Sequence, residues 1–343
     1  MTIDNAEQQA LTAAVMDDIV GMMKSRAISL AAQLQLADLV KDGPKSLAEL
    51  AQVTGTNKAA LYRLLYALVQ CGYFEEIEPE VFAQSERSHL LRTDLPRSLH
   101  GFAMIHGDEW QWAPWQRAIQ TLQTGEPVFS EMFGKDLWRY FQEDNPDAGQ
   151  RFQRAMNAQS KQYDQAIAHA YEFSAVGTIV DVAGGQGSLL TTILQTHPAA
   201  RGILFDQVSV IEMARQRHLT DNLEDRLELV SGNFFEAVPP GADTYLLKQI
   251  IHDWENDECI QILSNCRKAM KQGGRVLVVD EIITPGEKIP SLGPLIDLQL
   301  QLLMKGRKRS EAEHRPLFEA SGLQLTRVCP TQSSYTILEA TAL

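Results

Sequence analysis

The sequence predicts an α/β protein with a doubly wound, mostly parallel sheet of seven strands in its carboxyl-terminal half, preceded by a mainly helical domain. After Val176, short apolar runs alternate with helical segments, which is typical of strands joined by crossover helices. The last two runs are separated by five residues, too few for such a helix. Earlier in the chain, apolar residues recur at the helical spacing of three and four. A chain of 343 residues is long enough for two such domains.

The amino-terminal segment predicts helices followed by a hairpin. Ser46 and Glu49 have the spacing of a capping box that begins the second helix, and Asn57 caps the third. Gly72 ends the third helix, and the stretch Tyr73–Phe82 indicates a short β-hairpin. Helices followed by a small hairpin are the outline of a winged helix.

The charge of this segment argues against nucleic acid as its partner. Residues 1–95 hold 8 Lys+Arg against 13 Asp+Glu, and the whole chain has a net charge of −13. Proteins bind DNA largely by neutralising its phosphates with basic side chains. We therefore expect an interaction or dimerisation module, and a winged-helix transcription regulator is the less favoured alternative.

A second helical stretch, residues 95–173, is rich in large aromatic side chains. They are Trp110, Trp112, Trp115, Phe129, Phe133, Trp138, Tyr140 and Phe141. Aromatic residues at this density form either an ordinary core or the wall of a pocket for a flat apolar ligand. The sequence leaves both interpretations open.

The carboxyl-terminal half contains five runs that are apolar on both faces, as buried parallel strands are. They are Thr178–Ala183, Gly202–Asp206, Leu227–Ser231, Tyr245–Ile251 and Val276–Ile283. Two final runs, Gln324–Cys329 and Tyr335–Ala340, are expected to form an antiparallel hairpin at the edge of the sheet.

Residues after the first three strands predict a nucleoside site. The first strand runs into a glycine turn, with Gly184 and Gly185, and then into a helix whose free N–H groups can face a ligand. Asp206 ends the next strand about twenty residues later, where an acidic side chain can bind a ribose diol. Asn233 and Phe234 follow the third strand and suit the edge and face of a purine. The glycine spacing departs from GxGxxG, which disfavours a dinucleotide fold.

His252 is the candidate catalytic base. It follows the fourth strand directly before Asp253, and the pair Asp280-Glu281 lies near the end of the fifth strand. The carboxyl ends of parallel strands meet at one edge of a sheet, and a histidine base needs a carboxylate partner there.

The sequence predicts neither a metal site nor a membrane span. The acidic residues after His252 begin a helix, where they favour the helix dipole. The four cysteines form no CxxC pair, and no stretch approaches the ~18 apolar residues that a membrane helix needs. Acidic residues near the start of the chain differ from a secretory signal, so we expect a cytoplasmic protein.

These motifs together resemble the S-adenosylmethionine-dependent O-methyltransferases of the caffeic acid and acetylserotonin type. The resemblance rests on the glycine turn that follows Asp181, on Asp206, on the segments 232–235 and 247–254, and on residues 306–313. It implies a winged-helix-like dimerisation domain at 1–95, a helical linker and substrate-pocket region at 96–173, and a cofactor-binding methyltransferase domain at 174–343. Members of the family are homodimers in which this domain lends residues to the partner's site.

The resemblance also implies roles for individual residues. The expected cofactor-binding residues are Ser160, Asp181, Gly184, Gly185, Asp206, Gly232, Asn233, Phe234, Lys248 and Trp254. His252 corresponds to the general base, Glu281 to the acid that orients it, and Asp253 to a structural or substrate contact. Three positions depart from the family pattern: Ala183 replaces a glycine, Asn233 an aspartate, and Lys308 a carboxylate expected beside the histidine.

The implied reaction is transfer of the methyl group of S-adenosylmethionine to a hydroxyl of a small, phenolic or polyketide-like aromatic acceptor, with S-adenosylhomocysteine as the second product. No metal is needed, because the sulfonium supplies the leaving group and the protein aligns the reactants and removes a proton. A relative that binds S-adenosylmethionine for decarboxylation or hydroxylation is the alternative. The presence of His252 and Glu281 favours methyl transfer.

Overall fold

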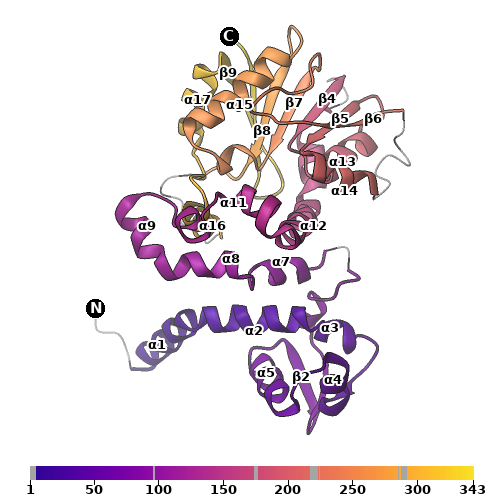
Figure 1. The fold of residues 1–343 in the computed structure, drawn as a ribbon, viewed down its shortest axis with the longest axis vertical. Helices are drawn as coiled ribbons and strands as arrows, with labels where there is room; N and C mark the ends of the chain where they lie inside the picture. Colours follow the sequence, from indigo (N-terminus) through magenta and orange to yellow (C-terminus); the bar gives the residue numbers. More distant parts are fainter. Residues whose placement is uncertain are drawn as a thin grey trace. The chain divides into compact units, whose positions relative to one another are not determined.

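The computed structural model describes residues 5–95, 97–173, 177–216, 223, 225–284, 286 and 292–343 (Figure 1). It divides into two compact units. Unit 1 comprises residues up to Ala113 together with Asp147–Ala158, and unit 2 comprises Pro114–Pro146 together with Gln159–Leu343. The expected domain limits at residues 96 and 174 lie outside the described residues, and that three-part division stays a prediction.

Unit 1 combines short helices with a small sheet. Its helices are α1 (Asn5–Ile19), α2 (Gly21–Gln33), α3 (Leu36–Leu39), α4 (Leu47–Thr54), α5 (Lys58–Gln70), α6 (Glu86–His89), α7 (His100–Ile105) and α8 (Glu109–Trp112). Its strands are β1 (Lys45–Ser46), β2 (Phe74–Glu78) and β3 (Val81–Gln84), in the order β1-β3-β2. The hairpin was predicted, whereas β1 has two residues and is too short to show a strand period.

The predicted helix caps of unit 1 are present. Ser46 Oγ accepts a hydrogen bond from the Glu49 N–H at 3.3 Å, and the Ser46 N–H donates to Glu49 Oε2 at 2.8 Å. Asn57 Oδ1 accepts from the Ala60 N–H at 3.1 Å. Both caps fix where α4 and α5 begin, and the apolar faces of these helices then pack on the hairpin around Phe82.

Helix α1 differs from the other helices of unit 1 because none of its side chains is buried. Leu11, Val15, Met16 and Ile19 are all exposed, and Ile19 has 74% of its surface accessible. Among the described residues of unit 1, none covers their apolar surface.

Unit 2 contains the seven-stranded sheet. Its strands are β4 (Thr178–Val182), β5 (Arg201–Asp206), β6 (Leu227–Ser231), β7 (Thr244–Lys248), β8 (Arg275–Asp280), β9 (Leu323–Pro330) and β10 (Thr336–Ala342). They lie in the order β6-β5-β4-β7-β8-β10-β9, with β4 to β8 parallel and β10 antiparallel to both neighbours. The predicted sheet and its antiparallel edge are confirmed.

Unit 2 also contains helices, some of which cover the two faces of this sheet. They are α9 (Ala118–Thr124), α10 (Phe129–Phe133), α11 (Leu137–Arg139), α13 (Ser188–Thr196), α14 (Val208–Gln216), α15 (Asn256–Ala269), α16 (Gly293–Leu303) and α17 (Glu311–Ala320), with the shorter turns η1 (Ala113–Arg117), η2 (Tyr140–Asp144) and η4 (Ile251–Asp253). The long helix α12 (Pro146–Ala170) passes from unit 1 into unit 2.

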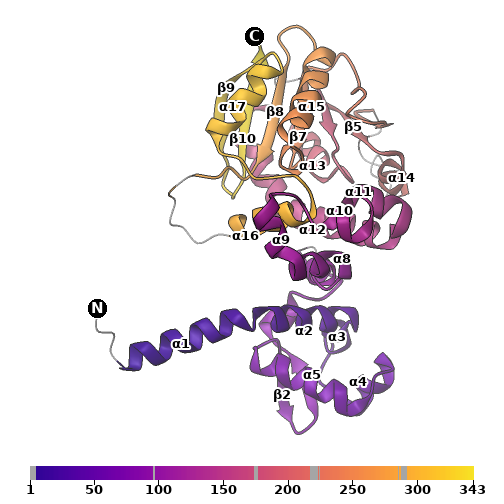
Figure 2. The same cartoon turned by 60° about the vertical axis from the view of Figure 1, so that its left-hand side comes forward.

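Two separate cores lie on the two faces. Helices α13 and α14 contribute to one core, whereas α15 and α17 contribute to the other, and Figure 2 shows α15 and α17 beside β8 and β10. Along β8 successive residues alternate between the cores: Val276 and Val278 pack on the α15 face, and Leu277 and Val279 on the α13 face. This alternation explains why the strand is apolar throughout.

Strands β7 and β8 end three residues earlier than predicted. The predicted ends were Ile251 and Ile283, whereas the observed ends are Lys248 and Asp280. The apolar runs extend beyond the strands because loop residues such as Ile251 and Ile282 pack against the core, Ile251 with its side chain fully buried. The earlier ends place Lys248 and Asp280 directly at the carboxyl edge. Within the described ranges, no helix is long and apolar enough to cross a membrane.

Candidate functional site

The carboxyl ends of β4 and β5 meet at a glycine turn. Asp206 ends β5, and its Oδ2 accepts a hydrogen bond from the Gly185 N–H at 2.8 Å while its Oδ1 accepts from the Gln207 N–H at 2.7 Å. Burial raises the pKa of Asp206 to about 6, against the two N–H groups that lower it. Each carboxylate oxygen accepts one of these bonds and has a second lone pair with which to accept another hydrogen bond.

The turn itself brings the backbone close to Asp181. A Cβ at Gly184 would lie 2.5 Å from the Asp181 carboxyl carbon, so only glycine fits there. Ala183 adopts a φ of 55°, a left-handed conformation that alanine tolerates at a cost of roughly 1–2 kcal/mol. Asp181 is buried beneath the turn, and burial raises its pKa to about 7.

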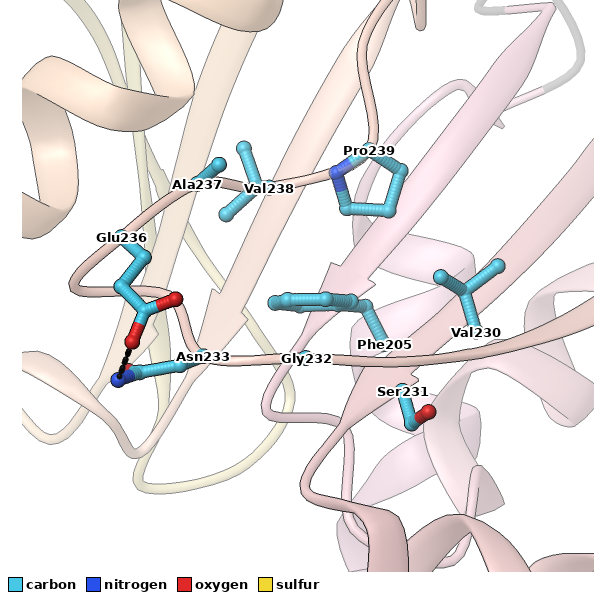
Figure 3. A pocket seen from close by; sticks show the side chains of 9 residues that line it. All are labelled: Phe205, Val230, Ser231, Gly232, Asn233, Glu236, Ala237, Val238 and Pro239. Atoms are coloured by element: carbon cyan, nitrogen blue, oxygen red, sulfur yellow. Dashed lines mark hydrogen bonds between the residues drawn. The ribbon is translucent and has the colours of Figure 1, made fainter.

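A small pocket of about 260 Å³ lies beside the loop after β6 (Figure 3). A Cβ at Gly232 would come within 2.5 Å of the Phe205 ring, which occupies the middle of the pocket wall. Asn233 shapes the loop: its Oδ1 accepts from the Phe235 N–H at 3.0 Å, and its Nδ2 donates to Glu236 Oε1 at 3.1 Å. The volume is below the roughly 300 Å³ of a typical small-molecule pocket.

An aromatic cluster joins this loop to the one after β7. The Trp254 ring makes edge-to-face contacts with Phe234 at 5.8 Å and with Phe235 at 4.8 Å. Trp138 stacks against Trp254 at 6.5 Å. Phe234 and Trp254, both expected at the cofactor, are therefore brought together.

The aromatic stretch between residues 95 and 173 serves partly as core. Trp110, Phe129 and Phe141 are buried, which fits the first of the two interpretations. Trp138 and Tyr140 are only half-buried and keep ring surface accessible. This stretch thus supplies both buried core residues and aromatic side chains that remain partly accessible.

Lys248 and Ser160 meet in a buried polar network. Lys248 Nζ pairs with Asp164 Oδ1 at 2.6 Å and also donates to Ser160 Oγ. Ser188 at the start of α13 donates to the other Asp164 oxygen. Asp164 was missed by the sequence analysis, although its position one helical turn after Ser160 on α12 is a signal that could have found it.

The His252 ring lies between two carboxylates. Its Nδ1 is 2.8 Å from both oxygens of Asp280, and its Nε2 is 3.3 Å from Asp253 Oδ1. Burial lowers the pKa of His252, but the two carboxylates outweigh burial and raise it to about 9. Burial in turn raises the pKa of Asp253 to about 6. The site therefore favours the imidazolium form of the ring.

Glu281 does not occupy the position expected of it. The carboxylate in contact with His252 Nδ1 is Asp280, whereas Glu281 pairs with Lys308 Nζ and accepts a hydrogen bond from Ser334 Oγ at 2.7 Å. The reason is geometric, because neighbouring residues at the end of a strand point to opposite sides. Lys308 is nearly buried, and its charge is balanced by Glu281.

Within the described ranges, no group of three or more His, Cys, Asp or Glu side chains could hold a metal ion. Cys71, Cys259, Cys266 and Cys329 are free thiols. The polar groups of the edge instead form three sets: the turn with Asp206, the Lys248 network, and the His252 group.

Comparison with known proteins gives matches along nearly the whole chain. A model of the O-methyltransferase domain matches residues 112–324, and one of the O-methyltransferase dimerisation domain matches residues 16–94. A phenazine O-methyltransferase of Lysobacter antibioticus is 38% identical over 330 residues, which cover 96% of each chain.

Two solved structures are also similar. The structure of a mitomycin 7-O-methyltransferase matches with a TM-score of 0.92 and 35% identity, covering 99% of this chain and 100% of the other. An O-methyltransferase of neocarzinostatin biosynthesis, solved with S-adenosylmethionine and 2-hydroxy-5-methyl naphthoic acid, matches with a TM-score of 0.82 and 30% identity, covering 93% and 96%.

Lys308 should hold down the pKa of His252. We expect Lys308→Met to raise that pKa above its wild-type value, because the change removes a cation and leaves the Glu281 carboxylate without its partner. Titration of the His252 ring signals by NMR measures the shift. Lys305→Met, which alters an exposed lysine, is the control and should leave the titration unchanged. A pKa that falls or stays constant in Lys308→Met would contradict this assignment.

Proposed function

The chain belongs to the S-adenosylmethionine-dependent O-methyltransferase family, and from this premise we propose that Asp206 and its neighbours hold the cofactor while His252 accepts the proton of the acceptor hydroxyl. The reaction is methyl transfer from S-adenosylmethionine to an aromatic acceptor, as the relatives named above perform it. The observation that carries the proposal is the His252 ring held between Asp280 and Asp253 at the same sheet edge as Asp206.

The residues at this edge fit the cofactor. The Asp206 carboxylate accepts one backbone hydrogen bond at each oxygen, which leaves acceptor capacity for the two hydroxyls of a ribose. Asn233 and Phe234 offer an amide and a ring for the adenine, and Lys248 with Ser160 offers donors for a carboxylate. When bound, S-adenosylmethionine supplies a methyl group on a positively charged sulfur.

His252 is suited to receive a phenolic proton. A phenol has a pKa near ~10 and an ordinary histidine one near ~6.5, so proton transfer between them is uphill by several units. The carboxylates at His252 raise its pKa to about 9 and remove most of this difference. With Asp280 accepting the proton of Nδ1, Nε2 is the nitrogen that takes up the hydroxyl proton.

The same shift has a consequence for pH. A histidine with a pKa of about 9 is mostly protonated at pH 7, and only its neutral form can accept a proton. Turnover is therefore expected to rise as the pH increases towards 9. Asp253, which lies at Nε2, would turn away or give up this contact when an acceptor hydroxyl takes its place.

The acceptor itself is proposed to be a small hydroxylated aromatic compound. The half-buried ring of Trp138 stacks against Trp254, which follows His252 by two residues in the chain. The Trp138 ring thus offers a flat apolar surface beside the loop that carries the base. Relatives carry names that refer to phenazine, hydroxybenzoate and naphthoate acceptors. This agreement supports the substrate class.

The homodimer is proposed to form through α1 and α2. The dimerisation-domain match begins at residue 16, and the exposed apolar side chains Met16, Ile19 and Met23 lie at or just after that point. A second copy of the chain would cover apolar surface that this chain leaves exposed.

Removing the Asp206 carboxylate should weaken cofactor binding. We expect Asp206→Ala to bind S-adenosylmethionine and S-adenosylhomocysteine about tenfold to a hundredfold less tightly, since a charge-assisted hydrogen bond contributes roughly 1.5–3 kcal/mol. Isothermal titration calorimetry measures both affinities. Asp225→Ala, at an exposed carboxylate away from the edge, should bind as the wild type does. Wild-type affinity in Asp206→Ala would remove Asp206 from the cofactor site.

Removing the His252 ring should separate catalysis from binding. We expect His252→Ala to lower kcat by ~10²–10⁴ while the affinity for S-adenosylhomocysteine stays within a few fold, because a positioned base contributes about that factor. His169→Ala, at an exposed histidine on α12, is the control. Full activity in His252→Ala would mean that the hydroxyl ionises unaided, and the proposed role of His252 would fail.

Charges placed on the exposed apolar stripe should disrupt the dimer. We expect the wild-type chain of 38.3 kDa to scatter light as a dimer, and the double variant Ile19→Glu/Met23→Glu to scatter as a monomer at micromolar concentration. Val53→Glu, at a similarly exposed position on α4, should remain dimeric. A wild-type monomer, or a dimer that persists in the double variant, would contradict the proposed interface.

A further inference from the structure

The loop that carries His252 is not held by regular secondary structure. It begins after Gln249, which adopts a φ of 56°, in the left-handed region that residues other than glycine rarely occupy. The three residues that follow Ile250 form only the short turn η4. A backbone in such a conformation persists when its surroundings fix it, so the contacts around this loop decide where the ring points.

Arg309 makes those contacts from a fully buried position. Its Nη1 donates to the Ile251 carbonyl oxygen at 2.8 Å, and its Nη2 donates to the Trp254 carbonyl oxygen at 2.7 Å. Nη2 also donates to Asn256 Oδ1 at 3.0 Å. The two carbonyl groups lie on either side of His252 and Asp253, so the planar guanidinium spans the turn.

The charge of Arg309 makes this arrangement unusual. No carboxylate forms an ion pair with it in the part of the chain that the structure describes, and burial lowers its pKa. A buried cation is costly unless strong hydrogen bonds replace its water. Here the acceptors are two main-chain carbonyls and the Asn256 side chain. The Cys259 thiol lies 3.3 Å from the Ile251 carbonyl oxygen and 3.4 Å from that of Trp254. The fold thus keeps a buried guanidinium at the one turn that carries the base.

Gly306, three residues before Arg309, lies close against the backbone of the same turn. A Cβ at Gly306 would lie 2.8 Å from the Asp253 Cα and closer still to the His252 carbonyl oxygen. We call residues 306–310 the strap. Its other contacts anchor it to the body of unit 2: the Lys308 N–H binds Asp297 on α16, and Ser310 caps α17. Because the strap is anchored in this way and lies against the loop, it helps to fix the position of the loop.

We propose that Arg309 is a positioning residue, which holds His252 against Asp280 by binding the carbonyl groups on either side of the η4 turn. This inference rests on the proposed role of His252 as proton acceptor. Arg309 acts only through the His252 ring that it positions and makes no contact of its own with the acceptor. A guanidinium is suited to the task because it presents two donors in one rigid plane.

The test compares Arg309 with an arginine of similar bonding elsewhere. Arg226 Nη1 also binds two main-chain carbonyls, those of Leu194 and Ala200, but neither lies near His252 in the chain. We expect Arg309→Met to lower kcat about tenfold to a hundredfold with little change in the KM of the acceptor, because small misplacements of a catalytic group have effects of this size. Arg226→Met should retain kcat.

Arg309→Lys adds a readout that loss of stability alone would not change. It keeps the positive charge but not the planar fork, so we expect a partial recovery of kcat. The charged groups facing His252 are Asp280 from β8, Asp253 from η4 and Lys308 from the strap, and all three remain. In Arg309→Lys the His252 ring is held less tightly, so its contact with Asp280 weakens and the pKa of His252 falls. The acidic limb of the plot of kcat against pH then moves to lower pH.

Each outcome decides the matter. Wild-type kcat in folded Arg309→Met, or an equal loss in Arg226→Met, overturns the proposal. If circular dichroism shows that Arg309→Met does not fold, Gly306→Ala takes its place, and wild-type kcat in that folded variant overturns the proposal. Full activity of His252→Ala would instead defeat the proposed function, whereas an inactive His252→Ala beside a fully active Arg309→Met would defeat only the role of Arg309.

Discussion

The other charged groups at the carboxyl edge of the sheet are arranged around the contact between the His252 ring and the Asp280 carboxylate. A carboxylate buried at the end of a strand needs a donor or a cation, and the ring provides one at Nδ1. Asp253 contacts Nε2 of the same ring, so one imidazole ring contacts two carboxylates. Lys308 and Lys248 are each paired with a carboxylate of their own, and the charges of the edge are thereby kept in separate sets.

The fold was largely predictable because it depends on patterns that are local in sequence. Apolar runs of strand length, capping residues such as Ser46, and the short connection before β10 each determine structure within a few residues. The ends of β7 and β8 were predicted three residues too late, since Ile251 is as apolar and as buried as a strand residue although it lies in a loop. A buried loop residue and a buried strand residue differ in how they pack, and the order of apolar residues in the sequence does not reveal that difference.

The functional site was predicted less completely, and the errors share a cause. Asp280 and Glu281 are adjacent acids, and which of them faces His252 depends on where the strand ends and on the direction in which each side chain leaves it. Arg309 binds main-chain carbonyl groups. Every residue has such a group, so the types of side chain in the sequence do not predict which residues Arg309 contacts. Asp164 lies 84 residues before the lysine with which it pairs. Such contacts are visible only after the chain has folded.

The position of β10 has a consequence for biosynthesis. This strand is the last of the described strands in sequence, yet it lies between β8 and β9, and Thr336 is in register with Asp280. On the ribosome, β8 therefore emerges more than fifty residues before the strand that pairs with its free side. Until then its backbone is an open edge, which invites pairing with other chains. The nascent chain thus carries Asp280 on an unpaired strand edge until β10 has been synthesised.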